Sequence, residues 1–188
     1  MSNVRSLRSP NLFQISSPLT NLNMNIRHVA TLGFVALVSA CTSYKPSLPD
    51  GYVGPRAAIR DTSVDQSQTR SDLFYISKVD GEAIRNTESA TLAANRGRGF
   101  SLTPSTLIHA VPARSSKFTV IGVSHYAAPI LALTSPVYRI EGVVEFTPQE
   151  GKLYAVRGSL SSGTSTVWIE DDTTAQVMGT KVEVLTQK

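Results

Sequence analysis

The sequence contains a single cysteine, Cys41, so no disulfide can form within the chain. Its main apolar run, residues 29–40, is far shorter than the ~20 residues that a transmembrane helix needs. No acidic residue occurs among the first forty positions. These absences argue against a disulfide-stapled scaffold and against a permanent membrane span, and they set the N-terminal region apart from the rest of the chain.

The apolar run follows Arg27 and His28 and ends in small residues. A positive start, a short apolar stretch and small residues at its end are typical of a secretory signal peptide. We therefore expect residues 1–40 to be a signal region. A second methionine, Met24, begins a signal of ordinary length and is the expected start of translation. The alternatives are that residues 1–23 form an unusually long leader or a tail with its own role.

Cys41 is preceded by Val38, Ser39 and Ala40. This stretch resembles the bacterial lipobox, in which a branched apolar residue and two small residues precede an invariant cysteine. The resemblance implies cleavage between Ala40 and Cys41, a diacylglycerol on the Cys41 sulfur, and a further acyl chain, such as palmitate, on the new amine. Each methylene buried in a bilayer contributes about 0.8 kcal/mol, so two or three chains would hold the protein on a membrane.

Thr42 follows the cysteine. By resemblance to sorted lipoproteins, a residue other than aspartate here implies the outer membrane of a bacterium with two membranes, with the protein facing the periplasm. The alternative for Cys41 is a small buried hydrophobe inside an ordinary helix.

The positive net charge of the chain also comes largely from its N-terminal region. Removing residues 1–40 takes away three of the 18 basic residues and none of the 14 acidic ones, which leaves 148 residues with a net charge of +1. A nucleic-acid partner would need a basic face, so none is expected. A chain of this length is sufficient for one domain with its own core.

Residues 41–55 are expected to form the lipidated N-terminus and a linker, and residues 56–188 the domain. The linker carries Pro46, Pro49 and Pro55 with two glycines and few apolar residues. Fully extended it would reach on the order of 45 Å. The alternative for its second half is a loop packed on the domain, through Tyr52 and Val53.

Beyond residue 56, short stretches of alternating polarity separated by turn residues predict an all-β fold. The expected strands are residues 57–60, 72–79, 82–85, 101–110, 117–126, 138–147, 152–160, 164–170, 175–178 and 181–185, with Asp80 and Gly81 in a tight turn. Residues 86–104 are expected to be a polar loop. About seven to nine short strands, several of them apolar on both faces, indicate an antiparallel two-sheet β-sandwich of immunoglobulin-like or PEGA-like type.

Two stretches resemble parts of small envelope lipoproteins with a PEGA-type or carboxypeptidase-regulatory β-sandwich. The first, residues 74–82, has the strand, Asp-Gly turn and return strand of those modules; the second, residues 144–156, is similar to a hairpin of uncharacterised proteobacterial lipoproteins. The resemblance implies a non-catalytic envelope module, and no functional residues are carried over from it.

Few residue patterns suggest chemistry. His109 and His125 lack a third ligand at metal-binding spacing, so we expect core or surface histidines and no metal. Glu170, Asp171 and Asp172 offer calcium ligands or, as we favour, a solvated turn.

Residues 96–99 offer an anion-binding loop or, as we favour, a solvated loop. No serine lies in a nucleophile elbow, since residues 158–163 match one only superficially. We expect no catalytic residue and no cofactor.

Tyr154 and Trp168 are the candidate binding surface, on neighbouring strands; the alternative is that they pack in the core or across strands. The sequence thus suggests an outer-membrane-anchored, non-catalytic interaction or structural module with an envelope protein as partner. The alternative is a small-ligand or glycan binder, or an inhibitor of an envelope hydrolase.

Overall fold

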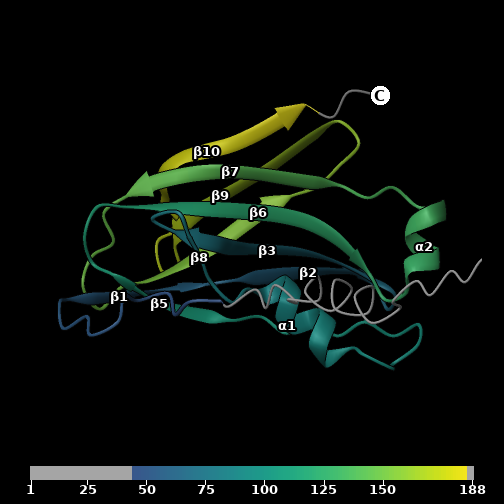
Figure 1. Ribbon diagram of the computed structural model, residues 1–188. Helices are drawn as coiled ribbons and strands as arrows, with labels where there is room; N and C mark the ends of the chain where they lie inside the picture. Colours follow the sequence, from purple (N-terminus) through teal and green to yellow (C-terminus); the bar gives the residue numbers. More distant parts are fainter. Residues whose placement is uncertain (1–43, 186–188) are drawn as a thin grey trace, which may run out of the picture. The chain divides into compact units, whose positions relative to one another are not determined.

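The computed structural model describes residues 44–185 (Figure 1). The predictions on Val38, Ser39, Ala40, Cys41 and Thr42 fall outside the described residues. No helix within residues 44–185 has the length and apolarity to cross a bilayer.

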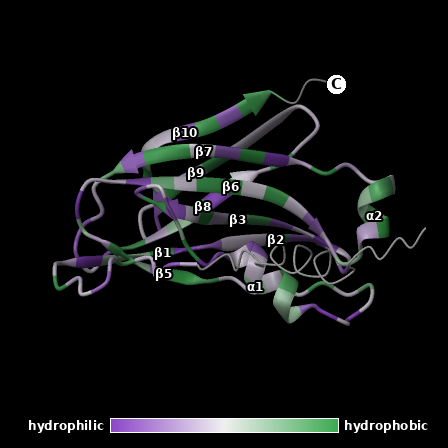
Figure 2. Ribbon diagram, in the orientation of Figure 1, coloured by the Kyte–Doolittle hydropathy of each residue, from purple (hydrophilic) through white to green (hydrophobic). Residues whose placement is uncertain are grey.

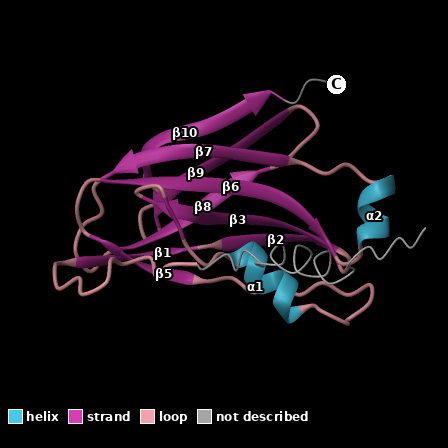
Figure 3. Ribbon diagram, in the orientation of Figure 1, coloured by secondary structure: helices cyan, strands magenta, loops and turns pink. Residues whose placement is uncertain are grey.

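The described chain contains ten strands and two short helices (Figure 3). In order they are β1 (Arg56–Arg60), β2 (Thr62–Ser67), β3 (Arg70–Val79), β4 (Glu82–Ala83), α1 (Thr87–Ala94), β5 (Ile108–Pro112), β6 (Ser116–Tyr126), α2 (Pro129–Thr134), β7 (Arg139–Phe146), β8 (Leu153–Ser159), β9 (Thr164–Asp171) and β10 (Val177–Leu185). The mostly-β class is confirmed, with ten strands rather than seven to nine.

The strands form two five-stranded sheets. One has the order β10-β9-β8-β1-β5, and the other the order β2-β3-β6-β7 with β4 on β3. Every pair is antiparallel except β1 and β8, whose parallel register sets Ile59 against Tyr154. β1 belongs to the first sheet and β2 to the second, so the chain crosses between the sheets at the single intervening residue, Asp61. β10 also packs beside β7, which joins the two sheets along one side (Figure 1).

The main core lies between the sheets and contains the inward residues that alternation predicts. Ile140 and Val144 of β7 and Tyr154 and Val156 of β8 are all in this cluster, as expected. Alternation over residues 72–79 predicts Phe74 and Ile76 on one face of the strand and Val79 on the other, and Phe74 and Ile76 do point into the core. Val79, however, joins the same cluster, because the register with β6 shifts between Ile76 and Lys78.

A second, smaller cluster lies on the outer face of the β2-β3-β6-β7 sheet and consists of Leu73, Tyr75, Ile121 and Val123. The helix α1 packs against β3 on this side, and the Tyr75 hydroxyl donates a hydrogen bond to Glu88 of that helix. The prediction that several strands are apolar on both faces, with partly covered outer faces, is therefore confirmed.

The predicted loop at residues 86–104 contains a helix, so that part of the prediction is wrong. Asn86 caps α1 by accepting a hydrogen bond from the Ser89 N–H, and the Ser89 side chain in turn accepts from the Asn86 backbone. Its buried residues are Thr87, Ala90 and Thr91, which are too small and polar to give an apolar period. α2, which starts with Pro129 in its first turn, was not expected either.

Several strand boundaries also differ from the expectation. β2 was not predicted, and the strand expected at residues 101–110 begins only at Ile108. The two last expected strands are one strand, β10, interrupted by an irregular register around Gly179. The expected hairpin at residues 144–156 is not a hairpin, because β7 and β8 belong to different sheets. The Asp80–Gly81 turn is as expected, with positive φ at both residues.

The expected linker contacts the domain from Lys45 onward. Lys45 forms a parallel bridge with Ile84, donates its N–H to the Ala83 carbonyl at 3.1 Å and pairs with Glu82 at 2.7 Å. The Ser47 hydroxyl donates to the Ala110 carbonyl of β5. Val53, proposed as a docking residue, is almost fully exposed. The segment that could act as a free tether therefore ends at Tyr44.

The ring of Phe74 occupies space left by two glycines on facing sheets. A Cβ at Gly158 would lie 2.3 Å from the Phe74 ring and 2.6 Å from the Thr166 carbonyl oxygen, and one at Gly122 would lie 3.1 Å from the ring. The absence of side chains at these positions is therefore what permits the aromatic ring at the centre of the core.

We expect Gly158→Ala to lower the free energy of unfolding by roughly 3 kcal/mol, because the added methyl group would overlap both the Phe74 ring and the Thr166 carbonyl oxygen. Gly163→Ala is the matched control, since its Cβ would meet nothing closer than 4.0 Å, and should change stability by less than about 0.5 kcal/mol. Urea unfolding of both variants measures the difference. Equal stabilities would show that the core is looser than the structure indicates.

Candidate functional site

Asp61 is the hub of a buried polar cluster at the crossing between the sheets. Its side chain is fully buried. One carboxylate oxygen accepts the Ile76 N–H at 3.1 Å, and the other accepts the Thr87 hydroxyl at 2.7 Å and lies 2.9 Å from His109 Nε2. Thr87 Oγ1 in turn accepts the Leu107 N–H. The carboxylate thus connects β3, the start of α1 and β5.

The geometry of this Thr–Asp–His group is that of a structural cluster and not of a nucleophilic catalytic site. The threonine hydroxyl is bonded to the carboxylate and not to the imidazole, which is the partner that would have to remove its proton. Thr87 is also fully buried, so a substrate cannot reach it. His109 is therefore a core histidine with a hydrogen-bond partner, as the sequence suggested.

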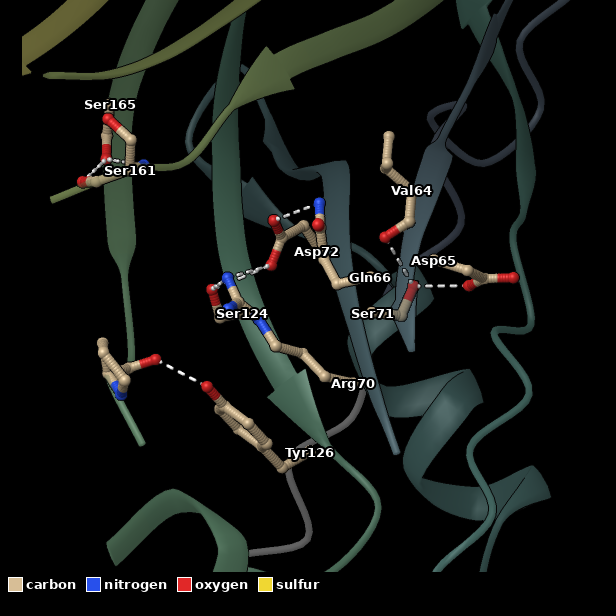
Figure 4. A network of polar contacts seen from close by, with 11 residues as sticks. Val64, Asp65, Gln66, Arg70, Ser71, Asp72, Ser124, Tyr126, Ser161 and Ser165 are labelled. Atoms are coloured by element: carbon tan, nitrogen blue, oxygen red, sulfur yellow. Dashed lines mark hydrogen bonds and ion pairs between the residues drawn. The ribbon is translucent and has the colours of Figure 1, made fainter. Parts of the chain in front are cut away.

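A second polar network closes one end of the core (Figure 4). Asp72 accepts hydrogen bonds from the Ser124 hydroxyl at 2.8 Å, from Arg70 at 3.1 Å and from the Gln66 amide at 3.1 Å. Figure 4 shows these side chains converging from β2, β3 and β6. Every oxygen of the buried Asp72 carboxylate is thereby satisfied, so this network seals the core.

The Arg70 guanidinium completes the seal. It lies 5.7 Å from the ring centroids of both Tyr126 and Tyr138, within range of cation–π attraction. Its Nε atom is buried and has no hydrogen-bond partner among the described residues.

The largest cleft described, about 690 Å³, lies between α1 with its following loop and α2 with the end of β6. This is within the size range of small-molecule sites. Its lining is Leu92, Asn95, Arg96, Gly97, Gly99, Leu102, Ser124, His125, Tyr126, Ala127, Ala128, Pro129, Ala132 and Val137. No acidic residue is among them.

Large apolar side chains surround this cleft and face solvent. We call them the cleft rim: Leu92 (54% exposed), Phe100 (62%), Ile130 (57%), Leu133 (80%) and Val137 (53%). Two of them line the cleft, and each of the other three is next in sequence to a lining residue. Figure 2 shows the hydrophobic positions on α2. Sequence reasoning missed the rim, although residues 129–134 are mostly apolar.

The electrostatics of the cleft are cationic. Arg96 and Arg98 form no ion pair or side-chain hydrogen bond with another described residue. Burial lowers the pKa of His125, and the nearby Glu88 only partly opposes this, so the imidazole is neutral at pH 7. The loop at residues 96–99, expected to be solvated, does lie at the surface, and it places Arg96 in the cleft wall.

The two aromatic candidates do not form one surface. Tyr154 is only 2% exposed and lies in the main core, where its hydroxyl accepts the Gln149 N–H at 3.0 Å. Trp168 is partly exposed on the outer face of the β10-β9-β8-β1-β5 sheet. The packing alternative therefore holds for Tyr154, and only Trp168 stays available at the surface.

Trp168 lies within a set of charged side chains on that outer face. It pairs in register with Arg157, and its indole N–H donates to Glu170 at 2.8 Å. Arg157 also bonds Glu170, at 3.1 Å, and the Lys181 ammonium lies 4.0 Å from the indole centroid. We call Arg60, Arg157, Trp168, Glu170 and Lys181 the Trp168 face.

The acidic run at the end of β9 is divided among different partners. Glu170 bonds Arg157 and Trp168, whereas Asp172 bonds Arg60 at 2.5 Å and pairs with Arg157 at 3.6 Å. Asp171 is held by Lys152 and by the N–H groups of Thr174 and Thr173, which lower the pKa of its carboxyl to about 2. Within residues 44–185 no cluster of three His, Cys, Asp or Glu side chains could hold a metal ion. The solvated-turn interpretation does not hold for Asp171, which is only 5% exposed and lies in β9.

No family model, no curated protein and no solved structure matches the chain.

We expect Asp61→Ala to lower the free energy of unfolding by about 3 kcal/mol or more, because it leaves the Ile76 N–H, the Thr87 hydroxyl and His109 buried without an acceptor. The control is Asp65→Ala, which removes an exposed carboxylate bonded only to the Ser71 hydroxyl and should cost about 0.5 kcal/mol. Thermal and urea unfolding of the two variants provide the measurement. Similar losses would mean that the buried cluster is not the hub described.

Proposed function

We propose that this chain is a lipid-anchored envelope lipoprotein whose β-sandwich is a non-catalytic interaction module. Cys41 would carry the lipid, the outer membrane would be the site of anchoring, and the domain would face the periplasm. The envelope protein partner would bind the Trp168 face. The likeness of residues 74–82 to PEGA-type modules belongs to the same proposal, and those residues do form the strand, turn and return strand.

The observation that carries the proposal is a sheet face on which tryptophan and arginine side chains are partly exposed within residues 44–185. The outer face of the β2-β3-β6-β7 sheet is covered by α1, whereas Trp168, Arg157 and Arg60 stay partly exposed on the other sheet. Tryptophan and arginine are the residues most enriched in the energetic centres of protein interfaces. The flanking ion pairs hold these side chains in place, which lowers the entropy lost on binding.

The glycan-binding alternative fits this surface less well. A sugar ring stacks on the open face of an aromatic side chain, and Lys181 already lies over the indole at 4.0 Å. Trp168 does not line the large cleft either, so a concave sugar site around it is not supported. A protein partner can instead use the edge of the indole together with the charged side chains beside it.

The anchor is tested by mass spectrometry of the protein purified from native membranes. We expect a chain that begins at Cys41 and carries a diacylglycerol and an additional acyl chain. Cys41→Ser should remain unprocessed, and Thr42→Asp should move from the outer to the inner membrane in a density gradient. Thr42→Ser is the matched control and should stay in the outer membrane. An unmodified chain that retains residues 1–40 would contradict the anchor.

The partner surface is tested by photo-crosslinking in membranes, with the probe at Thr166, which lies on the same side of β9 as Trp168. We expect one defined crosslinked protein, reduced at least about tenfold by Trp168→Ala, since loss of a central aromatic anchor costs roughly 2 kcal/mol or more. A probe at Lys78, exposed on the other sheet, should not give that product. Unchanged crosslinking in Trp168→Ala would reject this surface.

A further inference from the structure

The cleft rim is an apolar surface that needs a partner. Leu92, Phe100, Ile130, Leu133 and Val137 belong to two short segments that meet around one cleft, and each has more than half of its surface exposed. Exposed apolar side chains gathered on the segments around one cleft are a feature of interaction and membrane surfaces. Individual exposed residues elsewhere, such as Val64 on β2, need no such explanation.

The charges around the cleft indicate what kind of partner would bind the cleft rim. Arg96 and Arg98 are without ion-pair partners among the described residues, and no carboxylate lines the cleft. His125 adds no charge at pH 7 because burial holds its pKa down. Apolar side chains next to unpaired arginines are the pattern of a surface that enters the headgroup region of an anionic bilayer.

The length of the chain before the described residues places the expected anchor close to this surface. Lys45 is held beside Ile84, two residues before the N-cap of α1. The four residues from Cys41 to Lys45 can span at most about 14 Å. α1 extends from there toward the cleft and, with eight residues, is about 12 Å long. A lipid on Cys41 would therefore hold the α1 side of the domain against the bilayer.

We propose that the cleft rim, with Arg96 and Arg98, is a second membrane contact that docks on an anionic phospholipid surface. The apolar rim side chains enter the headgroup boundary, and the two guanidinium groups bind lipid phosphates. The acyl chains on Cys41 would hold the protein on the membrane, and a protein surface of this kind adds a second contact that orients the domain. The Trp168 face, on the outer side of the opposite sheet, then points away from the membrane. This orientation rests on the anchor of the proposed function.

The test uses residues 42–188 without lipid, a chain that keeps every described strand, both helices and both core clusters. This chain has no cysteine, so Thr134→Cys, next to Leu133 on α2, takes a single environment-sensitive fluorophore. Vesicles are made of phosphatidylcholine alone or of an equal mixture with phosphatidylglycerol, with bilayer-embedded nitroxide quenchers. We expect a blue shift and quenching with the anionic vesicles only. The matched probe at Glu183→Cys, on β10, should stay unquenched.

The role of charge is tested with matched reversals in the Thr134→Cys chain. Arg96→Glu should weaken binding to the anionic vesicles by fivefold or more, at about fivefold for each charge lost near the surface. Lys78→Glu changes the net charge equally on a different part of the domain and should have less than about a twofold effect. Ile130→Ser with Leu133→Ser should abolish the blue shift.

Three results would overturn the inference: no quenching at residue 134, equal quenching at residue 183, or equal effects of Arg96→Glu and Lys78→Glu. Shielding of the probe without vesicles, with a doubled mass in light scattering, would assign the rim to a second copy of the chain. Shielding by a soluble acidic peptide but not by vesicles would assign it to a protein. Because this chain carries no lipid, a negative vesicle result would not contradict the Cys41 anchor. In the same way, a native protein found without lipid would not contradict vesicle binding by the cleft rim.

Discussion

The fold depends on one buried carboxylate, that of Asp61, at the only residue between β1 and β2. Burying a charge in a core is costly unless donors surround it, and here an N–H, a hydroxyl and an imidazole do so. The cluster fixes the point at which the chain changes sheets and joins it to β5 of one sheet and β3 of the other. Thr87, the first residue of α1, belongs to it as well. One wall of the large cleft is thus attached directly to the core.

The parts of the fold that could be predicted are those whose sequence pattern is contained within a single strand or turn. Alternation in β7 and β8 identifies Ile140, Val144, Tyr154 and Val156 correctly as inward residues, because successive side chains of a strand point to opposite faces of the sheet. β2 was missed because most of its residues are polar and lie at the sheet edge. The turn at residues 148–151 was recognised, but a turn does not determine whether the next strand pairs with the previous one or joins the opposite sheet.

The helix α1 shows a different limit. Its buried side consists of Thr87, Ala90 and Thr91. Hydrogen bonds of the two threonines attach the helix to the domain, whereas most amphipathic helices are attached by packed leucines. The cleft rim could not be predicted either. Whether Leu133 or Phe100 is exposed depends on which other segments of the folded chain pack over them, and the local sequence does not contain this information. Trp168 and Tyr154 were assigned to one surface although they lie on opposite sides of their sheet.

The parallel pairing of β1 with β8 joins residues 58–60 to residues 153–155, nearly a hundred positions along the chain. The β10-β9-β8-β1-β5 sheet cannot form completely until β8 is available, and β1 has only β5 as a neighbour until then. Folds dominated by such long-range pairing form slowly, since the entropy of closing the loop is lost before the contacts are gained. The second sheet, in contrast, contains only strands that precede β8 in the sequence, so during synthesis its pairing partners are all present before the first sheet can be completed.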